Sequence, residues 1–203
     1  MENKKHWYDG FFYDKFVAPN QDLIFRMFKT QIDKGSTLLD VGCGTGRLEF
    51  QLANHCKEVI GLDLSSLNIK YANMHLNELG YKNVSFIHGS ILKIDELTDK
   101  HFDYALTSYV LHEMPPQMRI DSLKKMRQIA DKIIIGDYRV PMQKGFLSIS
   151  VKIIEFAAGP DHFKNFRHFI KTGGIEYLAK EAGLTITKKI SNKLPYAEIA
   201  ILE

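Results

Sequence analysis

Three glycines at alternate positions, the first of them two residues after an acidic residue, are the part of this sequence best suited to chemistry. The acid and the glycines are Asp40, Gly42, Gly44 and Gly46. Glycines let a backbone approach a ligand where a Cβ would clash, and they tolerate positive φ angles in a turn. A second apolar run, 59–62, ends in Asp63, whose carboxylate can accept hydrogen bonds from both hydroxyls of a ribose. A strand, a glycine turn, a helix and an acid-terminated strand together predict a site for an adenine nucleoside.

The spacing of these glycines disfavours a dinucleotide such as NAD. Dinucleotide-binding turns read G-x-G-x-x-G, with the third glycine three residues after the second. Here the third glycine comes two residues after the second, and Arg47 stands at the dinucleotide position. Asp40 also lies inside the turn, where it would repel a pyrophosphate but suit a ligand that carries an amino group. We therefore do not expect NAD to bind.

His112 is the candidate for a catalytic base. It follows an expected strand at 104–107, and ligands of open α/β folds bind beyond the carboxyl ends of the strands. The unperturbed pKa of histidine, about 6.5, suits proton removal at neutral pH. The alternative is a structural histidine that orients its loop or fixes Glu113.

The aromatic N-terminal segment 7–16 and residues 138–172 are expected to recognise the substrate. The candidate polar contacts are Tyr138, Arg139 and His162, with Asn165 and Arg167 as alternatives to His162. The apolar run 146–158 has two interpretations. It is either an extra helix, buried on the sheet or in a dimer interface, or one wall of an apolar pocket for the substrate.

No metal site is predicted from the sequence. His162 and His168 lack a supporting pattern of ligands, and the two cysteines, Cys43 and Cys56, do not have the spacing of metal ligands. Cys43, inside the glycine turn, is best interpreted as a small buried thiol.

Alternating strand and helix patterns predict the frame that holds these residues. Apolar runs predict strands at 37–41, 59–62, 84–88, 104–107, 132–135, 184–190 and 197–202. Apolar periodicity and capping residues predict helices at 20–33, 47–55, 65–79, 115–129 and 175–181. The alternation implies a mostly parallel sheet with helices on both faces. The last two strands have no helix between them, which predicts an antiparallel hairpin at the sheet edge.

Length and composition favour one globular α/β domain over residues 1–203. Of the 203 residues, 45% are hydrophobic and 25% are charged, which suffices for a substantial core. The net charge of +3 and the dispersed Lys and Arg residues disfavour a nucleic-acid partner. The sequence shows neither an apolar signal segment nor a run long enough to span a membrane, so we expect a cytoplasmic protein.

Several segments, taken together, resemble the class I S-adenosylmethionine (AdoMet) methyltransferases. The glycine turn is similar to the first motif of that family, acid-x-G-x-G-x-G, and residues 59–65 are similar to the second. Residues 102–112 are similar to the fourth motif, and 133–137 fall at the fifth strand. The subgroup most resembled contains the ubiquinone and menaquinone C-methyltransferases. The resemblance implies a Rossmann-like, seven-stranded sheet with an antiparallel last strand. It also implies methyl transfer from AdoMet to a small apolar or aromatic acceptor, with S-adenosylhomocysteine as the product.

The resemblance assigns cofactor contacts to matching positions. The residues concerned are Tyr13, Asp40, Gly42, Gly44, Gly46, Asp63, Leu64, Ser90, Ile91 and Thr107. Asp63 would hold the ribose, and Leu64 would pack on the adenine. The family usually has an acid where Ser90 stands, so the bond to the adenine amino group is expected to be weaker. Tyr13 matches the tyrosine of an aromatic leader, and we expect residues 1–33 to form a lid and a helix, with 7–17 as the mobile part.

Two other functions stay open. A protein or RNA methyltransferase is disfavoured because the N-P-P-Y signature of amino-group methylation is missing at 107–110. A nucleoside-binding regulatory protein that has lost catalysis is disfavoured by the intact glycine turn and Asp63. A homodimer is a further open question, and the sequence does not name the acceptor atom.

Overall fold

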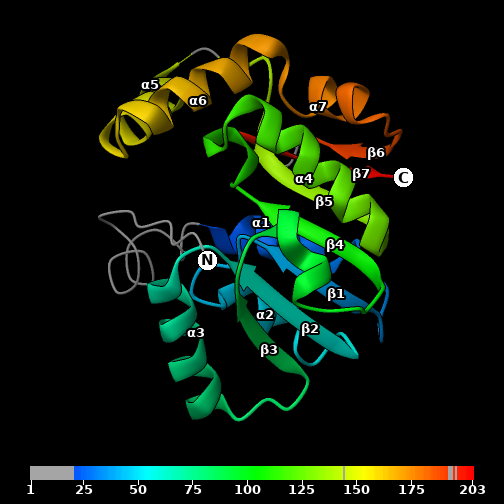
Figure 1. Cartoon of the computed structure of the whole chain (residues 1–203). Coiled ribbons are helices and arrows are strands. Elements are labelled where there is room, and N and C mark those ends of the chain that lie inside the picture. Colours follow the sequence, from blue (N-terminus) through cyan, green and yellow to red (C-terminus); the bar gives the residue numbers. More distant parts are fainter. Residues whose placement is uncertain (1–20, 144, 192–193, 195) are drawn as a thin grey trace. The chain divides into compact units, whose positions relative to one another are not determined.

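Seven strands form one sheet, in the order β3-β2-β1-β4-β5-β7-β6, in the computed structural model of this chain (Figure 1). The structure describes residues 21–143, 145–191, 194 and 196–203. The strands are β1 (Thr37–Val41), β2 (Glu58–Asp63), β3 (Val84–His88), β4 (Phe102–Ser108), β5 (Ala130–Tyr138), β6 (Ile186–Ile190) and β7 (Ala197–Leu202).

The directions of the strands confirm the predicted fold class. β1 pairs in parallel with both β2 and β4, and β2 pairs in parallel with β3. β7 runs antiparallel to both of its neighbours, β5 and β6. The fold is therefore a Rossmann-like, mostly parallel sheet with an antiparallel last strand, as the sequence predicts.

Helices and short 3₁₀ turns connect the strands. They are α1 (Asp22–Lys29), α2 (Arg47–Leu52), α3 (Ser66–Leu79), η3 (Ile91–Glu96), η4 (Leu111–Glu113), α4 (Pro116–Ile129), α5 (Phe146–Ala157), α6 (Pro160–Thr172) and α7 (Gly174–Ala182). The ends of α3 follow the expected chemistry. The side chain of Ser65 accepts a hydrogen bond from Asn68 N–H at the start, and Gly80 ends the helix with a φ of 73°.

The chain divides into two compact units, and each is described here by itself. Among the described residues, the first unit contains 21–106 and 129–131, and the second contains 107–128 and 132–203. In the first unit, Leu38, Leu39 and Val59 are fully buried. In the second, the run 133–135 of β5 is fully buried, as expected for a strand covered on both faces.

Some element boundaries differ from the predicted ones. The helix predicted at 20–33 ends at Lys29, because the next residue, Thr30, donates its hydroxyl to Met27 O at 2.7 Å and so competes with the helical backbone. The helix predicted at 47–55 ends at Leu52. Residues 1–20, which include Tyr13 and the expected lid, lie outside the described residues.

The apolar run 146–158 forms α5, and a helix that was not predicted, α6, follows it. Gly159, with a φ of 124°, separates the two, and Pro160 opens α6 at a position where proline is favoured. Val151 and Glu155 of α5 are buried, whereas the apolar side chains of Ile149, Ile153, Ile154 and Phe156 are 56–67% exposed. The predicted helix is therefore present, but these side chains are not buried on the sheet. Among the described residues, no helix combines the length and apolar character needed to cross a bilayer.

Candidate functional site

Gly42, Gly44 and Gly46 form the turn between β1 and α2 in the first unit. Their φ angles are 88°, 56° and 85°, all in the left-handed region that residues with a Cβ rarely adopt. The N–H groups of Gly42 and Cys43 both donate to Leu62 O, at 2.7 and 3.2 Å. The turn predicted from the glycine spacing is therefore held against the carboxyl end of β2.

Asp63 is bonded directly to this turn. Gly44 N–H donates to Asp63 Oδ2 at 2.9 Å, and Ser65 N–H donates to Oδ1 at 2.7 Å. The two N–H groups fix the orientation of the carboxylate at the carboxyl end of β2.

Asp40 and Glu49 place two buried carboxyl groups beside the turn. Asp40 is 2% exposed and Glu49 is 0% exposed. Burial raises the pKa of Glu49 well above its usual range, and the charge of Asp40 raises it further. Burial raises the pKa of Asp40 to about 7, with a lowering contribution from the hydrogen bond of Glu49 and a raising one from the charge of Asp63. Burial therefore disfavours ionisation of both carboxyl groups, and each charge further raises the pKa of an acidic neighbour.

Gly61 makes room for the carboxyl group of Glu49. It pairs with Asp40 in the register of β1 and β2. A Cβ at this position would lie 2.6 Å from Glu49 Oε1 and 2.9 Å from Cys43 Cβ, so a larger residue would displace them. Cys43 is a buried free thiol, and burial raises its pKa well above the usual range, which fits the predicted small, inert thiol.

Leu64, Ser90 and Ile91 follow the carboxyl ends of two neighbouring parallel strands, β2 and β3. The structure therefore brings them together near Asp63. Ser90 Oγ accepts a hydrogen bond from Leu92 N–H at 3.2 Å and caps η3, while its own proton can be donated to a ligand. Ile91 is buried and Leu64 is half-buried.

Two other predicted cofactor residues are not part of this group. Thr107 lies in β4, belongs to the second unit and is 1% exposed. Tyr13 lies outside the described residues. The assignment of all these residues to a cofactor stays a prediction.

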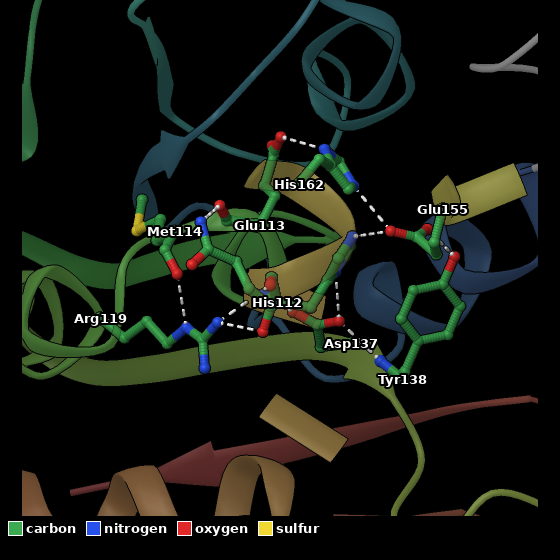
Figure 2. Close-up of polar contacts among 9 residues, drawn as sticks. His112, Glu113, Met114, Arg119, Asp137, Tyr138, Glu155 and His162 are labelled. Atoms are coloured by element: carbon green, nitrogen blue, oxygen red, sulfur yellow. Dashed lines mark hydrogen bonds and ion pairs between the residues drawn. The ribbon is translucent and has the colours of Figure 1, made fainter. Parts of the chain in front are cut away.

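His112 lies at the centre of a buried polar cluster in the second unit (Figure 2). It belongs to η4, directly after β4, as the sequence predicts. Its Nδ1–H donates to Asp137 Oδ1 at 2.7 Å, and its backbone N–H donates to Asp137 Oδ2 at 3.2 Å. Its Nε2 lies 3.4 Å from Glu155 Oε2. Two carboxylates from β5 and α5 therefore flank the imidazole.

Glu155 joins three side chains of this cluster. Its Oε1 accepts a hydrogen bond from Tyr138 Oη at 2.7 Å, and its Oε2 lies 2.6 Å from His162 Nε2. On the far side of the second imidazole, His162 Nδ1 lies 3.4 Å from Glu113 Oε2. Carboxylates and imidazoles thus alternate through the buried region. The structure brings together His112, Tyr138 and His162, which the sequence proposes separately.

The carboxylates hold a proton on His112 in this arrangement. Burial alone lowers the pKa of His112, but the charges of Asp137 and Glu155 and their hydrogen bonds raise it well above its ordinary value. Burial alone raises the pKa of Glu155, but the charge of His112 and the hydrogen bonds from His112 and His162 hold it well below its usual range. A doubly protonated imidazole cannot accept a proton, so His112 can act as a base only after it loses one.

Arg119 fixes η4 against α6. Its side chain is 0% exposed. Its Nε donates to Met114 O at 2.8 Å, and its Nη2 donates to His112 O at 3.0 Å and to Asn165 O at 2.6 Å. Asn165 Nδ2 donates to Glu113 O at 2.9 Å. Burial lowers the pKa of Arg119 to about 10, so the guanidinium stays charged at neutral pH.

Arg139, a predicted substrate residue, is bonded elsewhere in the second unit, outside the polar cluster around His112. Arg139 Nη1 donates to Ser191 O at 3.1 Å, so it contacts the segment between β6 and β7. The roles of Tyr138, Arg139 and His162 toward a substrate stay predictions.

Sequence reasoning gave no role to several residues of these clusters, namely Glu49, Arg119, Asp137 and Glu155. One of them carries a signal that could have found it. Glu155 is the single acidic residue of the apolar segment 146–158, and a carboxylate in an apolar helix requires a buried partner.

Residues 32–149 match the model of a protein family described as a methyltransferase domain. The chain belongs to this family. The match covers more than half of the 203 residues. It includes the glycine turn, Asp63 and His112, and it ends within α5.

Two curated relatives agree with this membership, and a solved structure shares the fold. The chain is 30% identical over 140 residues to the demethylmenaquinone methyltransferase of Anoxybacillus flavithermus, covering 66% of this chain and 56% of that protein. It is 28% identical over 163 residues to the ubiquinone biosynthesis O-methyltransferase of Nitrosospira multiformis, covering 77% and 65%. The chain thus spans less than two thirds of each of these relatives. The PH0226 protein of Pyrococcus horikoshii superposes with a TM-score of 0.70 at 19% identity, covering 96% and 94%, which shows a shared fold.

Proposed function

We propose that this member of the methyltransferase domain family transfers the methyl group of AdoMet to a small apolar or aromatic molecule and releases S-adenosylhomocysteine. The observation that carries the proposal is the glycine turn, with the carboxylate of Asp63 bonded to Gly44 N–H. The buried carboxyl groups of Asp40 and Glu49 lie beside that turn.

The acids around the turn fit a ligand with a positive charge. Asp40 Oδ1 is buried and receives no hydrogen bond from an N–H group of the described residues. Burial and the charge of Asp40 raise the pKa of Glu49 well above its usual range, so the carboxylates that remain for a cationic ligand at the turn are those of Asp63 and, in its ionised form, Asp40. An ammonium group complements these charges, whereas a pyrophosphate is repelled by them. The residues therefore favour AdoMet over NAD.

In the proposed complex, the first unit supplies binding and alignment. Asp40 faces the amino group of the ligand, and Asp63 accepts hydrogen bonds from its ribose. Leu64, Ser90 and Ile91 surround the adenine. AdoMet supplies a methyl group that is already strongly electrophilic, so the protein has to align donor and acceptor and exclude water. Alignment of this kind can lower the activation barrier by about 7–11 kcal/mol. A general base adds ~10²–10⁴-fold in rate, which corresponds to about 3–5 kcal/mol, so alignment is the larger contribution.

We infer that the acceptor is an aromatic molecule with a hydroxyl group or an activated ring carbon, such as a quinol. The names of the two curated relatives, a demethylmenaquinone methyltransferase and a ubiquinone biosynthesis O-methyltransferase, support this class. We also infer that the protein acts in the cytoplasm, without nucleic acid, and that residues 7–17 close over the cofactor. The exposed apolar side chains of α5 are the first place to look for a homodimer interface.

Two measurements test the proposal. Isothermal calorimetry should detect binding of S-adenosylhomocysteine and none of NAD; tight NAD binding without AdoMet binding would refute the cofactor assignment. Turnover of AdoMet to S-adenosylhomocysteine should then be followed with a panel of quinols, phenols, thiols and amines. A protein that binds the cofactor but methylates no member of the panel supports the non-catalytic nucleoside-binding alternative.

A further inference from the structure

Three metal-ligating side chains converge within the polar cluster of the second unit. His112, Glu155 and His162 each offer one ligand atom, and these atoms all lie within 4.8 Å of one another. The Nε2 atoms of His112 and His162 lie 3.4 and 2.6 Å from Glu155 Oε2. The three residues come from three different elements, η4, α5 and α6. Their side chains are 4%, 5% and 9% exposed, so bulk water does not compete strongly for these atoms.

The donor set is one that transition metals prefer. Two imidazole nitrogens and one carboxylate oxygen form a complete three-residue ligand set for Zn²⁺, with a fourth position left open. Imidazole also suits Co²⁺ and Ni²⁺, whereas Mg²⁺ prefers oxygen ligands. Ligands about 2.1 Å from a tetrahedral ion lie roughly 3.4 Å apart. His112 Nε2 and Glu155 Oε2 are 3.4 Å apart, and His162 Nε2, at 2.6 Å from Glu155 Oε2, would move outward by less than 1 Å.

The outer contacts of the three side chains match those of a metal site. Metal-bound histidines usually donate their second ring N–H to a carboxylate, and metal-bound carboxylates are themselves hydrogen-bonded. Here Asp137 lies at His112 Nδ1 and Glu113 lies at His162 Nδ1, at 2.7 and 3.4 Å. Tyr138 donates to the other oxygen of Glu155, at 2.7 Å. The Asp137 contact is a hydrogen bond and the Glu113 contact is an ion-pair distance, and in both imidazoles Nε2 is the atom that lies beside Glu155 Oε2.

The carboxylates around the two imidazoles also favour a cation. Asp137 and Glu155 lie against His112, and Glu155 and Glu113 lie against His162. Metal ligation requires neutral histidines, so a bound ion would take the place of the proton that the carboxylates hold on His112 in the metal-free protein.

We propose that His112, Glu155 and His162 bind one divalent transition-metal ion, through Nε2, Oε2 and Nε2, and that its remaining position is open to an oxygen of a bound small molecule. Asp137, Glu113 and Tyr138 orient these ligands without touching the ion. Metal binding does not require AdoMet, so the proposal can fail or succeed independently of the proposed methyl transfer.

The test uses the full-length, untagged protein after treatment with a chelator and dialysis. Co²⁺ is titrated while visible absorption is recorded, and Zn²⁺ is then added to displace it. We expect one ion per chain, with Mg²⁺ unable to compete. Each of His112→Gln, His162→Gln and Glu155→Gln should weaken binding by more than about 100-fold, and Asp137→Asn by about 10- to 100-fold.

His101→Ala is the matched control. His101 pairs with a carboxylate, Asp131, at 2.8 Å, but its side chain is 55% exposed and it does not belong to the three-ligand group. We expect this variant to bind metal like the unaltered protein. If a variant of the cluster does not fold, X-ray absorption at the zinc edge is measured on the Zn²⁺-loaded unaltered protein instead. We expect this spectrum to show two imidazole nitrogens at about 2.0–2.1 Å from the ion. The proposal is overturned if the unaltered protein binds no Co²⁺ or Zn²⁺. It is also overturned if folded His112→Gln and His162→Gln proteins bind as tightly as His101→Ala, or if the absorption spectrum shows no imidazole.

Discussion

The carboxyl group of Asp40 should make binding of S-adenosylhomocysteine depend on pH. In the protein without ligand, its pKa is raised to about 7, so about half of it is ionised at pH 7 and about one hundredth at pH 5. The ammonium group of the ligand interacts favourably only with the ionised form. We therefore expect affinity to be about 50-fold weaker at pH 5 than at pH 7, a loss of about 2.3 kcal/mol.

Calorimetry at both pH values, repeated in buffers of different ionisation enthalpy, measures both the affinity and the protons released. Binding should release about half a proton at pH 7 and nearly one at pH 5. Asp40→Asn should bind more weakly at pH 7 and lose most of the pH dependence. Asp103→Asn is the matched control in the same unit, because Asp103 is an exposed carboxylate with a lowered pKa, held mainly by hydrogen bonds from Thr37.

Two results would refute this reasoning: equal affinity of the unaltered protein at both pH values, or an unchanged pH dependence in Asp40→Asn. The same raised pKa has a consequence for stability. A carboxyl group with a folded-state pKa above its ordinary 3.8 contributes stability that is fully present below pH 3.8 and is lost as the pH rises through about 7. The free energy of unfolding, compared with that of Asp40→Asn, should therefore fall over this pH range.

Four further changes test other parts of the structure. Asp63→Ala removes a charged acceptor and should weaken binding of S-adenosylhomocysteine by about ten- to a hundred-fold in calorimetry; unchanged affinity would show that the second motif is misassigned. Gly61→Ala forces a Cβ against Glu49 and should lower the free energy of unfolding in urea by about 1–3 kcal/mol, and equal stability would contradict the packing described. If His112 acts as a base, after losing its second ring proton, His112→Ala should lower turnover by ~10²-fold or more with little change in AdoMet affinity; near-normal turnover would leave His112 a structural residue. Hydrogen exchange over 7–17 should be fast without ligand and slow with S-adenosylhomocysteine, and equally slow exchange in both states would rule out a lid.

The sheet and the glycine turn could be predicted because their signals are local. The inner parallel strands β1, β2 and β4 are short, mostly buried runs, since both of their faces are covered. The turn needs left-handed φ angles at 42, 44 and 46, and only glycine adopts these without strain. Asp63 was found because it follows such a run directly.

The polar cluster of the second unit could not be predicted, because it is assembled from distant segments. His112 and His162 are 50 residues apart in the sequence, and Glu155, seven residues before His162, lies in a different helix, so no ligand spacing in the sequence marks a metal site. Their proximity depends on the turn at Gly159, which folds α6 back on α5, and on the buried Arg119. Glu49 was missed for a related reason. It lies in α2 and Asp40 lies in β1, and the apolar pattern of a helix does not indicate which strand residue its side chains will contact.

The bonds of Arg119 have a consequence for how this protein can diversify. The guanidinium contacts Met114, His112 and Asn165 through their main-chain oxygens, and every residue type has such an oxygen. The side chain at Met114 can therefore be exchanged without removing a hydrogen bond from Arg119. Substitutions of side chains in η4 and α6 could then change which groups line the polar cluster, while the hydrogen bonds to Arg119 keep the backbone of both elements in position. A family that acts on different acceptors could evolve new specificities in this way, provided that the arginine is retained.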